Sequence, residues 1–214
     1  MVERDTSKSI NQNRVAIVTG GATRIGREIC LTLHAAGFDL CVHCNTSIAS
    51  ASKLVNQLNS KRPESAFFVE QDLTKANFAQ NIIDRVSALK GRLDLLVNNA
   101  STFSKNSMVS SLGEHWDKTL SSNAKAPYYL SVNSAKLLSE TRGSIVNISD
   151  IHGERPRQGY SIYCVSKAAL DAVTKSLAIE LAPRIRVNSV APGAIVWADS
   201  EKNQERTEAL SVTP

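Results

Sequence analysis

Short apolar runs alternate with amphipathic segments along most of the chain. The runs are rich in β-branched residues and show little polar alternation, which is typical of strands buried on both faces of a parallel sheet. We expect strands at residues 14–18, 38–44, 66–70, 93–97, 143–148 and 184–190.

The segments between these runs carry apolar residues at helical spacing. We expect helices from the first glycine turn to Gly37, at 47–60 and 78–89, in two stretches of 112–139 joined near Asn123 and Pro127, and from about Tyr160 to before Pro183. Strands that alternate with helices, without internal repeats, predict an α/β fold with a doubly wound parallel sheet of the Rossmann type.

The composition fits one domain, because 214 residues with 42% hydrophobic and 21% charged residues can bury a sizeable core. We expect that domain over residues 14–214, after a flexible polar N-terminus at 1–13. No apolar run reaches membrane-spanning length and the polar start is not a signal peptide, so we expect a cytoplasmic protein without a membrane partner. The net charge of +5 comes from scattered Lys and Arg, which argues against nucleic-acid binding.

The four cysteines do not form a recognisable metal site. Cys41 and Cys44 have CxxC spacing, but in a strand their side chains point to opposite faces. No second Cys/His pair stands at the usual zinc spacing. We expect all four, Cys30 and Cys164 included, to be buried or incidental thiols, and no metal.

A glycine-containing turn, TGGATRIG at residues 19–26, joins the first expected strand to a helix. Such a turn lets a pyrophosphate approach the helix N-terminus closely, where free N–H groups and the helix dipole favour anions. A glycine turn can also be merely structural, but its place at the first strand–helix junction favours nucleotide binding.

The end of the second strand indicates which dinucleotide is preferred. NAD-binding folds usually carry a carboxylate there for the ribose 2′-hydroxyl. This chain has His43 and then Cys44 through Ser47, with no carboxylate. Arg24 in the glycine turn can bind a phosphate bidentately, although it can equally be a surface residue. The pattern favours NADPH.

Polar residues follow the third and fourth strands. Asp72 can cap the next helix or bind an adenine. Asn98 and Asn99 can tie neighbouring loops together at the carboxyl edge of the sheet and line a cofactor crevice. Phe103 follows them, and an aromatic side chain beside the crevice can stack on a flat ring, although an exposed aromatic there can also be chance.

Tyr163 and Lys167 stand four residues apart at the start of the last expected helix, on the same helix face. An ammonium beside a phenol favours the phenolate, so we expect the pKa of Tyr163 to fall from about 10 towards the working range of a proton donor. A lone Tyr-x-x-x-Lys pair arises by chance on many helices, so the pair gains weight only from the rest of the chain.

The glycine turn, the segment Asn98-Asn99-Ala100, Asn123, the Tyr163/Lys167 pair and Pro192-Gly193 together resemble the short-chain dehydrogenase/reductase family. The resemblance extends from about residue 14 to 197 and implies a single dinucleotide-binding catalytic domain. Most members carry a serine thirteen residues before the tyrosine, where this chain has Asp150. That Asp, the Arg in the turn and the strings NNASTF, DIHGERP and APGAIVW are similar to the pteridine reductases of the family, the bacterial members above all.

The resemblance implies NADPH-dependent hydride transfer to a pterin or dihydropterin, dihydrofolate included. Tyr163 would donate the proton, Lys167 would lower its pKa and hold the nicotinamide ribose, Asn123 would anchor a relay water, and Asp150 would orient the pterin or take part in protonation. Phe103 would sandwich the pterin against the nicotinamide while Ser101 bonds its polar edge. The cofactor contacts expected are Gly20, Arg24, Ile25, Gly26, Asn45, Thr46, Ser47, Asp72, Leu73, Asn99, Ala100, Ser101, Tyr163, Lys167, Pro192 and Gly193.

Two features depart from that family. Residues 44–47 lack the arginine that some pteridine reductases use for the 2′-phosphate, which leaves Arg24 and backbone groups to bind it. Members also continue past this length with a last helix and a seventh strand that help to build a tetramer. We therefore expect the C-terminal strand to be missing, the sixth strand to be an exposed edge, and a homotetramer where the full tail is present.

Two other functions remain open. The chain could reduce another carbonyl substrate, such as a ketoacyl thioester or a sugar, although Asp150 in place of serine argues against it. It could also be an inactive nucleotide-binding subunit, which the short tail favours and the intact Tyr163, Lys167 and Asn123 oppose.

Overall fold

The computed structural model describes residues 13–106 and 113–193. The expected short tail and all but the last residue of the expected flexible N-terminus lie outside the described residues. Six parallel strands form one sheet with the order β3-β2-β1-β4-β5-β6. Their bounds are β1 Val15–Val18, β2 Asp39–Cys44, β3 Ala66–Glu70, β4 Leu95–Asn98, β5 Ser144–Ile148 and β6 Arg186–Val190.

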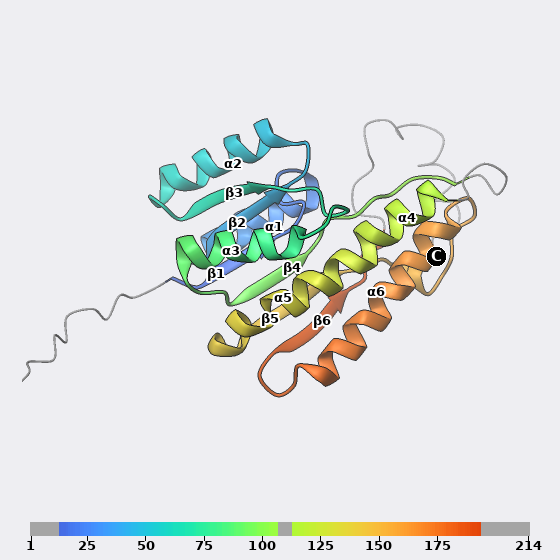
Figure 1. The fold of residues 1–214 in the computed structure, drawn as a ribbon. Coiled ribbons are helices and arrows are strands. Elements are labelled where there is room, and N and C mark those ends of the chain that lie inside the picture. The colour runs from blue at the N-terminus through green and yellow to red at the C-terminus, as the bar shows by residue number, and fades with distance from the viewer. Residues whose placement is uncertain (1–12, 107–112, 194–214) are drawn as a thin grey trace, which may run out of the picture.

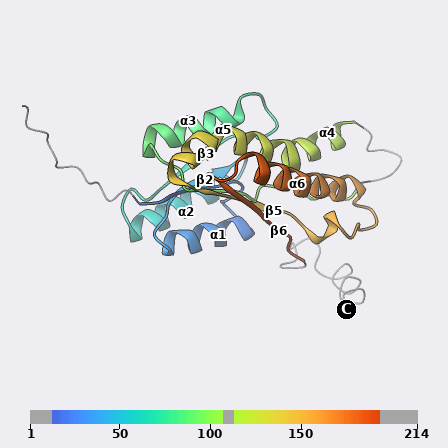
Figure 2. The ribbon, with the colours of Figure 1, turned by 90° about the horizontal axis from the view of Figure 1, so that it is seen from below.

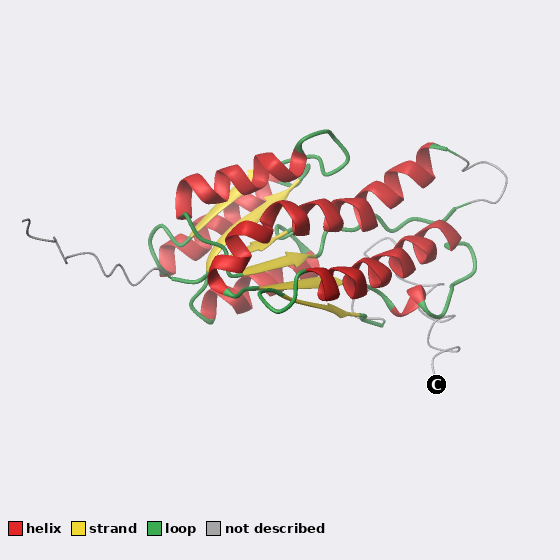
Figure 3. Ribbon diagram, turned by 60° about the horizontal axis from the view of Figure 1, so that its bottom comes forward, coloured by secondary structure: helices red, strands yellow, loops and turns green. Residues whose placement is uncertain are grey.

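Helices cover both faces of this sheet (Figures 1 and 2). Figure 2 shows α1 and α2 on one side and α3, α4, α5 and α6 on the other. The helices are α1 Arg24–Ala35, α2 Ile48–Lys61, α3 Phe78–Lys90, α4 Glu114–Leu120, α5 Ala126–Thr141 and α6 Ser161–Glu180, with a short 3-10 helix, η2, at Ile151–Gly153. The three layers of helix, sheet and helix, coloured by type in Figure 3, confirm the expected doubly wound α/β fold.

The central strands β1 and β2 are buried on both faces, as their continuous apolar runs predict. All four residues of β1 and all six of β2 are buried. One core cluster contains Ile17 and Cys41, and the other contains Val18 and Val42, so neighbouring residues of one strand serve opposite helical layers. Cys44 lies in a third cluster, and the four cysteines are buried free thiols. The expectation that Cys41 and Cys44 point to opposite faces is confirmed.

The two helical stretches expected to join near Asn123 and Pro127 do meet there. α4 continues into a single π-helical turn, η1 at Ser121–Lys125, and then directly into α5. Pro127 is tolerated because it lies in the first turn of α5, where a missing N–H costs little. The π turn accommodates Asn123 without ending the helix.

Two strands, β4 and β6, begin two residues later than the sequence indicates. Leu93 is buried, but the ladder of β4 starts at Leu95, because the carboxylate of Asp94 accepts the N–H of Val15 at 2.8 Å and pairs with Arg92. β6 starts at Arg186 rather than at residue 184. Among the described residues β6 is an edge strand, and four of its five residues are exposed.

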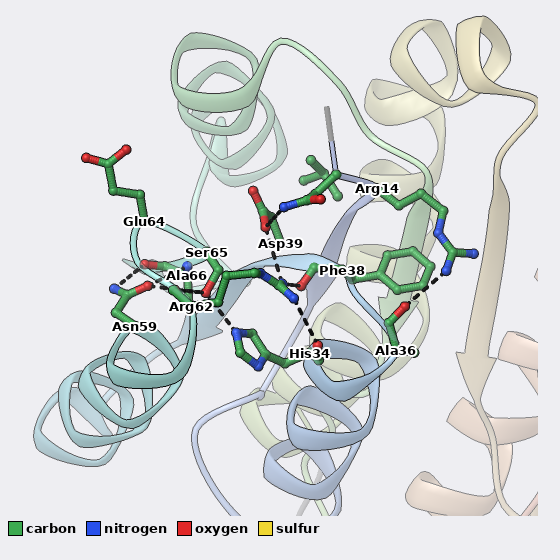
Figure 4. Close-up of polar contacts among 12 residues, drawn as sticks. Arg14, His34, Ala36, Phe38, Asp39, Asn59, Arg62, Glu64, Ser65 and Ala66 are labelled. Carbon is green, nitrogen blue, oxygen red and sulfur yellow. Dashed lines mark hydrogen bonds and ion pairs between the residues drawn. The ribbon is translucent and has the colours of Figure 1, made fainter. Parts of the chain in front are cut away.

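A polar cluster closes the amino-terminal edge of the sheet (Figure 4). Asp39 pairs with Lys90 at 2.8 Å and with Arg62 at 3.3 Å, which ties the start of β2 to the ends of α3 and α2. His34 near the end of α1 lies 2.7 Å from the hydroxyl of Ser65. These contacts lie at the opposite edge of the sheet from the residues that follow the strands, so they fix the scaffold and leave the carboxyl edge open for a site.

Candidate active site

The sheet order places the carboxyl ends of β1 and β4 side by side, at the switch point where parallel α/β sheets bind their ligands. Asn99 joins the two loops there. Its side-chain amide donates to the carbonyls of Thr19 at 2.9 Å and Gly20 at 3.2 Å. The Thr19 hydroxyl in turn accepts the N–H groups of Asn99 and Ala100. The expected tying role of the Asn pair is confirmed for Asn99.

The glycines of the turn after β1 are packed too closely to carry a side chain. A Cβ at Gly26 would lie 2.1 Å from the carbonyl oxygen of Gly20, and Gly20 itself has φ of +60°. Such a turn forms the kind of glycine cradle into which a pyrophosphate fits, so the residues present suit a dinucleotide. Arg24 is exposed and has φ of +51°, a left-handed conformation that costs a non-glycine residue about 1 kcal/mol. Strained backbone of this kind is common at functional sites.

The residues expected around the adenosine lie at the carboxyl ends of β2 and β3. Asn45 and Thr46 are exposed directly after β2, followed by Ser47 before α2. Asp72 does not cap α3, because its carboxylate accepts the N–H and hydroxyl of Thr74 at 2.8 and 2.7 Å, well before that helix begins. These hydrogen bonds lower the pKa of Asp72.

Leu73, also expected at the cofactor, has a buried side chain in a core cluster. Leu73 can therefore present only its backbone to a ligand.

Tyr163 and Asp150 form the chemical centre of the site. The hydroxyl of Tyr163, on the first turn of α6, donates to Oδ2 of Asp150 at 2.7 Å. Oδ1 of Asp150 accepts the N–H of His152, so both carboxylate oxygens are held in place. Lys167 lies one turn further along α6, with its Nζ 5.6 Å from the centre of the Tyr163 ring and donating to the carbonyl of Ile148 at 2.8 Å.

The electrostatics differ from the expectation for this pair. Burial, followed by the hydrogen bond and charge of Asp150, raises the pKa of Tyr163, and a hydrogen bond from Ser101 opposes that rise. Lys167 is not among the groups that shift the pKa of Tyr163, and its ammonium donates to the carbonyl of Ile148 instead. Burial lowers the pKa of Lys167 to about 8, against the opposing charges of Asp150 and Asp171. Tyr163 is thus held as a protonated phenol against a carboxylate.

Asn123 supports the opposite wall of the site. Its side chain accepts the N–H of Thr102 at 2.7 Å and donates to the carbonyl of the same residue at 2.9 Å. The amide also donates to the hydroxyl of Ser166 on α6 at 3.0 Å. The π turn therefore directs a fully buried amide at the loop that carries Ser101 and Phe103.

Phe103 lies beside the reactive tyrosine. Its ring meets the Tyr163 ring edge-on with centres 4.8 Å apart and stacks on Tyr160 with centres 4.6 Å apart and planes 13° from parallel. The side chain is 43% exposed, and Ser101 is exposed as well. A flat substrate ring can therefore reach an aromatic face next to the phenol and the carboxylate.

The last expected residues, Pro192 and Gly193, follow β6 at the same edge of the sheet. The carbonyl of Pro192 accepts the N–H of Ile151 at 3.2 Å, which holds this segment against the loop of Asp150. The structure thus gathers the expected catalytic residues Asn123, Asp150, Tyr163 and Lys167 with Ser101 and Phe103.

Within the described residues, 13–106 and 113–193, no group of three or more His, Cys, Asp or Glu could hold a metal ion. In the same residues, no helix has the length and apolarity needed to cross a membrane.

A model of the short chain dehydrogenases matches residues 14–209, and the chain belongs to this family of oxidoreductases. Members use a nicotinamide dinucleotide, NADH or NADPH. Pteridine reductase 1 of Leishmania tarentolae is 38% identical, over 86% of this chain and 78% of that protein. The 3-oxoacyl-[acyl-carrier-protein] reductase FabG of Staphylococcus epidermidis is 33% identical, over 93% of this chain and 79% of that protein.

Sequence reasoning missed three supporting residues. Thr19 holds the loop after β4, Ser166 accepts the amide of Asn123, and Tyr160 stacks on Phe103. A polar residue at the end of a buried strand is a usable signal for Thr19. Nothing in the spacing indicates the partners of Ser166 and Tyr160, because those contacts depend on how α6 packs against other elements.

Proposed function

We propose that the protein reduces a pterin or dihydropterin with NADPH. The observation that carries the proposal is the hydrogen bond of 2.7 Å between Tyr163 and Asp150, at the position where most relatives carry serine. A carboxylate can accept the N–H groups of an aminopyrimidine ring, which a serine hydroxyl does less well. The neighbouring Phe103 ring offers a flat surface for such a heterocycle.

NADPH is supported by the residues at the adenosine end. Asn45, Thr46 and Ser47 follow β2 without a carboxylate that would repel a 2′-phosphate. The exposed guanidinium of Arg24 lies in the glycine turn, where a phosphate contact is possible. The glycine turn itself would receive the pyrophosphate, and Lys167 would hold the nicotinamide ribose. When bound, the cofactor supplies a hydride.

The chain's own residues supply the proton and the positioning. Tyr163 stays protonated because burial and Asp150 raise its pKa, so its O–H is available for donation to a ring nitrogen as hydride reaches the adjacent carbon. Asp150 orients the ring, and Phe103 covers it. Asn123 fixes the loop that carries Ser101 and Phe103.

A second candidate is reduction of a ketoacyl thioester. The 33% identity with the reductase FabG supports it, and Tyr163, Lys167 and Asn123 would serve the reduction of a carbonyl as well as that of a pterin. Asp150 favours the pterin, because a carbonyl substrate needs a hydrogen-bond donor at that position rather than an anion.

The deciding experiment measures NADPH oxidation with a dihydropterin, a ketoacyl thioester and an NADH control. We expect turnover of the dihydropterin with a preference for NADPH. Turnover of the thioester alone would contradict the pterin proposal. Tyr163→Phe should abolish turnover and spare NADPH binding. Activity that survives Tyr163→Phe would refute the assigned proton donor.

We further propose that the protein is cytoplasmic and assembles as a homotetramer. Tyr128, Tyr129 and Val132 expose large apolar side chains on α5, at 41%, 47% and 46%, a surface suited to self-association. Light scattering of the purified protein tests the assembly, and a monomeric mass would contradict it.

A further inference from the structure

His43 is a buried polar residue within a strand that is otherwise apolar at its centre. It lies in β2 and is 2% exposed. Nδ1 of its ring lies 3.1 Å from the N–H nitrogen of Gly20, and Nε2 lies 2.8 Å from the carbonyl oxygen of Gln71. Both ring nitrogens are therefore engaged. Nδ1 contacts the segment after β1, and Nε2 contacts the segment after β3.

These two partners determine the protonation state of the ring. A carbonyl oxygen can only accept, so Nε2 of His43 must carry a hydrogen and donate to Gln71. A backbone N–H can only donate, so Nδ1 must carry a lone pair and accept from Gly20. Only the neutral ring with its hydrogen on Nε2 satisfies both contacts.

The ring joins the two loops that flank the adenosine end of the candidate cofactor site. Gly20 begins the glycine turn after β1, and the next N–H, that of Gly21, donates to the backbone carbonyl of His43 at 2.9 Å. Gln71 follows β3 and stands directly before Asp72, and its N–H donates to the carbonyl of Cys44 at 2.9 Å. His43 therefore fixes the position of the glycine turn after β1 relative to the loop of Gln71 and Asp72 after β3.

We propose that neutral His43 is a positioning residue for NADPH, and that its protonation in acid releases the glycine turn and weakens NADPH binding. A proton on Nδ1 would face the N–H of Gly20, so two donors would meet and the turn would have to move. This inference rests on the proposed binding of NADPH at the glycine turn.

The charges around the ring do not stabilise an imidazolium. Burial lowers the pKa of His43, and the hydrogen bond to the carbonyl of Gln71 opposes that effect, with no contribution from a charged side chain among the described residues. None of the titratable groups on the elements beside the ring contributes to the pKa of His43. These groups are Asp39, Cys41 and Cys44 on β2, Arg24, Arg27, Glu28, Cys30 and His34 on α1, Lys53 and Lys61 on α2, Glu70 on β3 and Asp72 after β3. The thiols of Cys30 and Cys44 are neutral, because burial raises their pKa.

The test measures the Kd of NADPH by fluorescence titration from about pH 8 down to about pH 5, across the ordinary histidine pKa. We expect His43→Phe, which leaves the N–H of Gly20 buried without an acceptor, to raise Kd roughly tenfold to a hundredfold at neutral pH. The kcat at saturating NADPH should change little, because His43 lies at the adenosine end. His43→Asn can keep an acceptor near Gly20, so its Kd should rise less.

The pH profile separates positioning from a purely structural role. The 2′-phosphate of NADPH titrates near pH 6, and both His43→Asn and the unsubstituted protein retain that titration. We expect an additional acid loss of affinity only in proteins that keep His43. The matched control His34→Asn removes another buried histidine, at the opposite edge of the sheet, and should leave Kd and its pH profile unchanged.

The remaining outcomes are decisive. Equal Kd values and pH profiles for the unsubstituted protein and His43→Asn, together with an unchanged Kd in His43→Phe, would overturn this inference and leave the proposed function intact. If the unsubstituted protein did not bind NADPH at all, the proposed function and this inference would both fail. Nitrogen chemical shifts of His43 at neutral pH give a test that needs no substitution, and a charged ring or an Nδ1–H tautomer would refute the proposal.

Discussion

The side chain of Asn123 makes two hydrogen bonds to the backbone of one residue, Thr102, accepting its N–H at 2.7 Å and donating to its carbonyl at 2.9 Å. The amide thus acts as a clamp across 21 residues of sequence. Thr102 stands between Ser101 and Phe103, so the clamp fixes both of the residues that we assign to the substrate. The clamp forms because the π turn η1 places the side chain of Asn123 against the backbone of Thr102.

Replacement of Asn123 should lower kcat more than it lowers the free energy of unfolding. We expect Asn123→Ala to cost about 1–3 kcal/mol of stability, because three hydrogen bonds are lost and the N–H of Thr102 is left unpaired, and to lower kcat at least tenfold because Phe103 loses its support. Thermal unfolding and steady-state kinetics with a dihydropterin measure the two effects. The matched control is Asn133→Ala on α5, whose side chain donates to the carbonyl of Tyr129 and, within the described part of the chain, makes no hydrogen bond to the loop of Thr102. Equal effects of the two substitutions would contradict the clamp.

Asp150 should decide which substrate is accepted. Asp150→Ser introduces the serine of the family resemblance and removes a carboxylate that accepts a hydrogen bond from the Tyr163 hydroxyl. We expect kcat/KM for the dihydropterin to fall about a hundredfold, the equivalent of a lost charged hydrogen bond, while activity towards a ketoacyl thioester rises. The pKa of Tyr163 should fall, because Asp150 raises it now.

The measurement compares kcat/KM for both substrates in the original and substituted proteins, with the acidic limb of the pH profile as a second readout. Asp150→Asn serves as the control for charge, since it keeps the size of the side chain. If Asp150→Ser left the dihydropterin activity unchanged, the carboxylate would have no role in substrate choice.

Much of the fold could be predicted from the sequence because its signals are local. Buried parallel strands read as continuous apolar runs, so all six strands were predicted within two residues of their ends. The position of Gly20 and Gly26 between strand and helix indicated a tight turn, and a Cβ at Gly26 would indeed meet the carbonyl of Gly20. These patterns depend only on residues that are close together in the sequence.

The features that were missed depend on distant partners. The sequence indicated only a mild helix defect at Asn123, where two helical stretches join, and not the π turn that directs its amide at a loop 21 residues away. The pKa expected for Tyr163 was wrong in direction, because a Tyr–Lys spacing on one helix says nothing about burial or about Asp150 on another segment. Asp72 bonds Thr74 instead of capping α3, a choice between two local partners that the sequence left open.

The glycine turn offers a direct test of the close packing at the cofactor site. Gly26→Ala would place a Cβ 2.1 Å from the carbonyl oxygen of Gly20 and 2.6 Å from the amide of Asn99. We expect a loss of about 2–3 kcal/mol of stability, as for overpacked cores, and loss of NADPH binding because the turn must open. Gly113→Ala is the matched control, since no described atom lies within 4 Å of its added Cβ. Urea unfolding and NADPH titration of both variants give the comparison, and a normal NADPH affinity in Gly26→Ala would contradict the assigned turn.

The cluster at the amino edge of the sheet should make folding sensitive to acid. Burial, and then the charges of Arg62 and Lys61, lower the pKa of His34 below its ordinary value of 6.5. A histidine with a lowered folded pKa takes up its proton more readily in the unfolded chain, so the free energy of unfolding should fall as pH drops below about 6.5 and level off once the folded pKa is passed. Above that pH the ring is neutral in both states and contributes no pH dependence.

His34→Asn should therefore reduce the acid loss of stability, measured as the shift of the urea midpoint between about pH 7 and about pH 5, on either side of the ordinary histidine pKa. His43 titrates in the same direction, since burial lowers its pKa too, so the double variant with His43→Asn should lose more of the slope than either single variant. The exposed carboxylates contribute at lower pH and remain in every variant. A slope between pH 7 and 5 that stays unchanged in the double variant would show that neither buried ring is neutral in the folded protein.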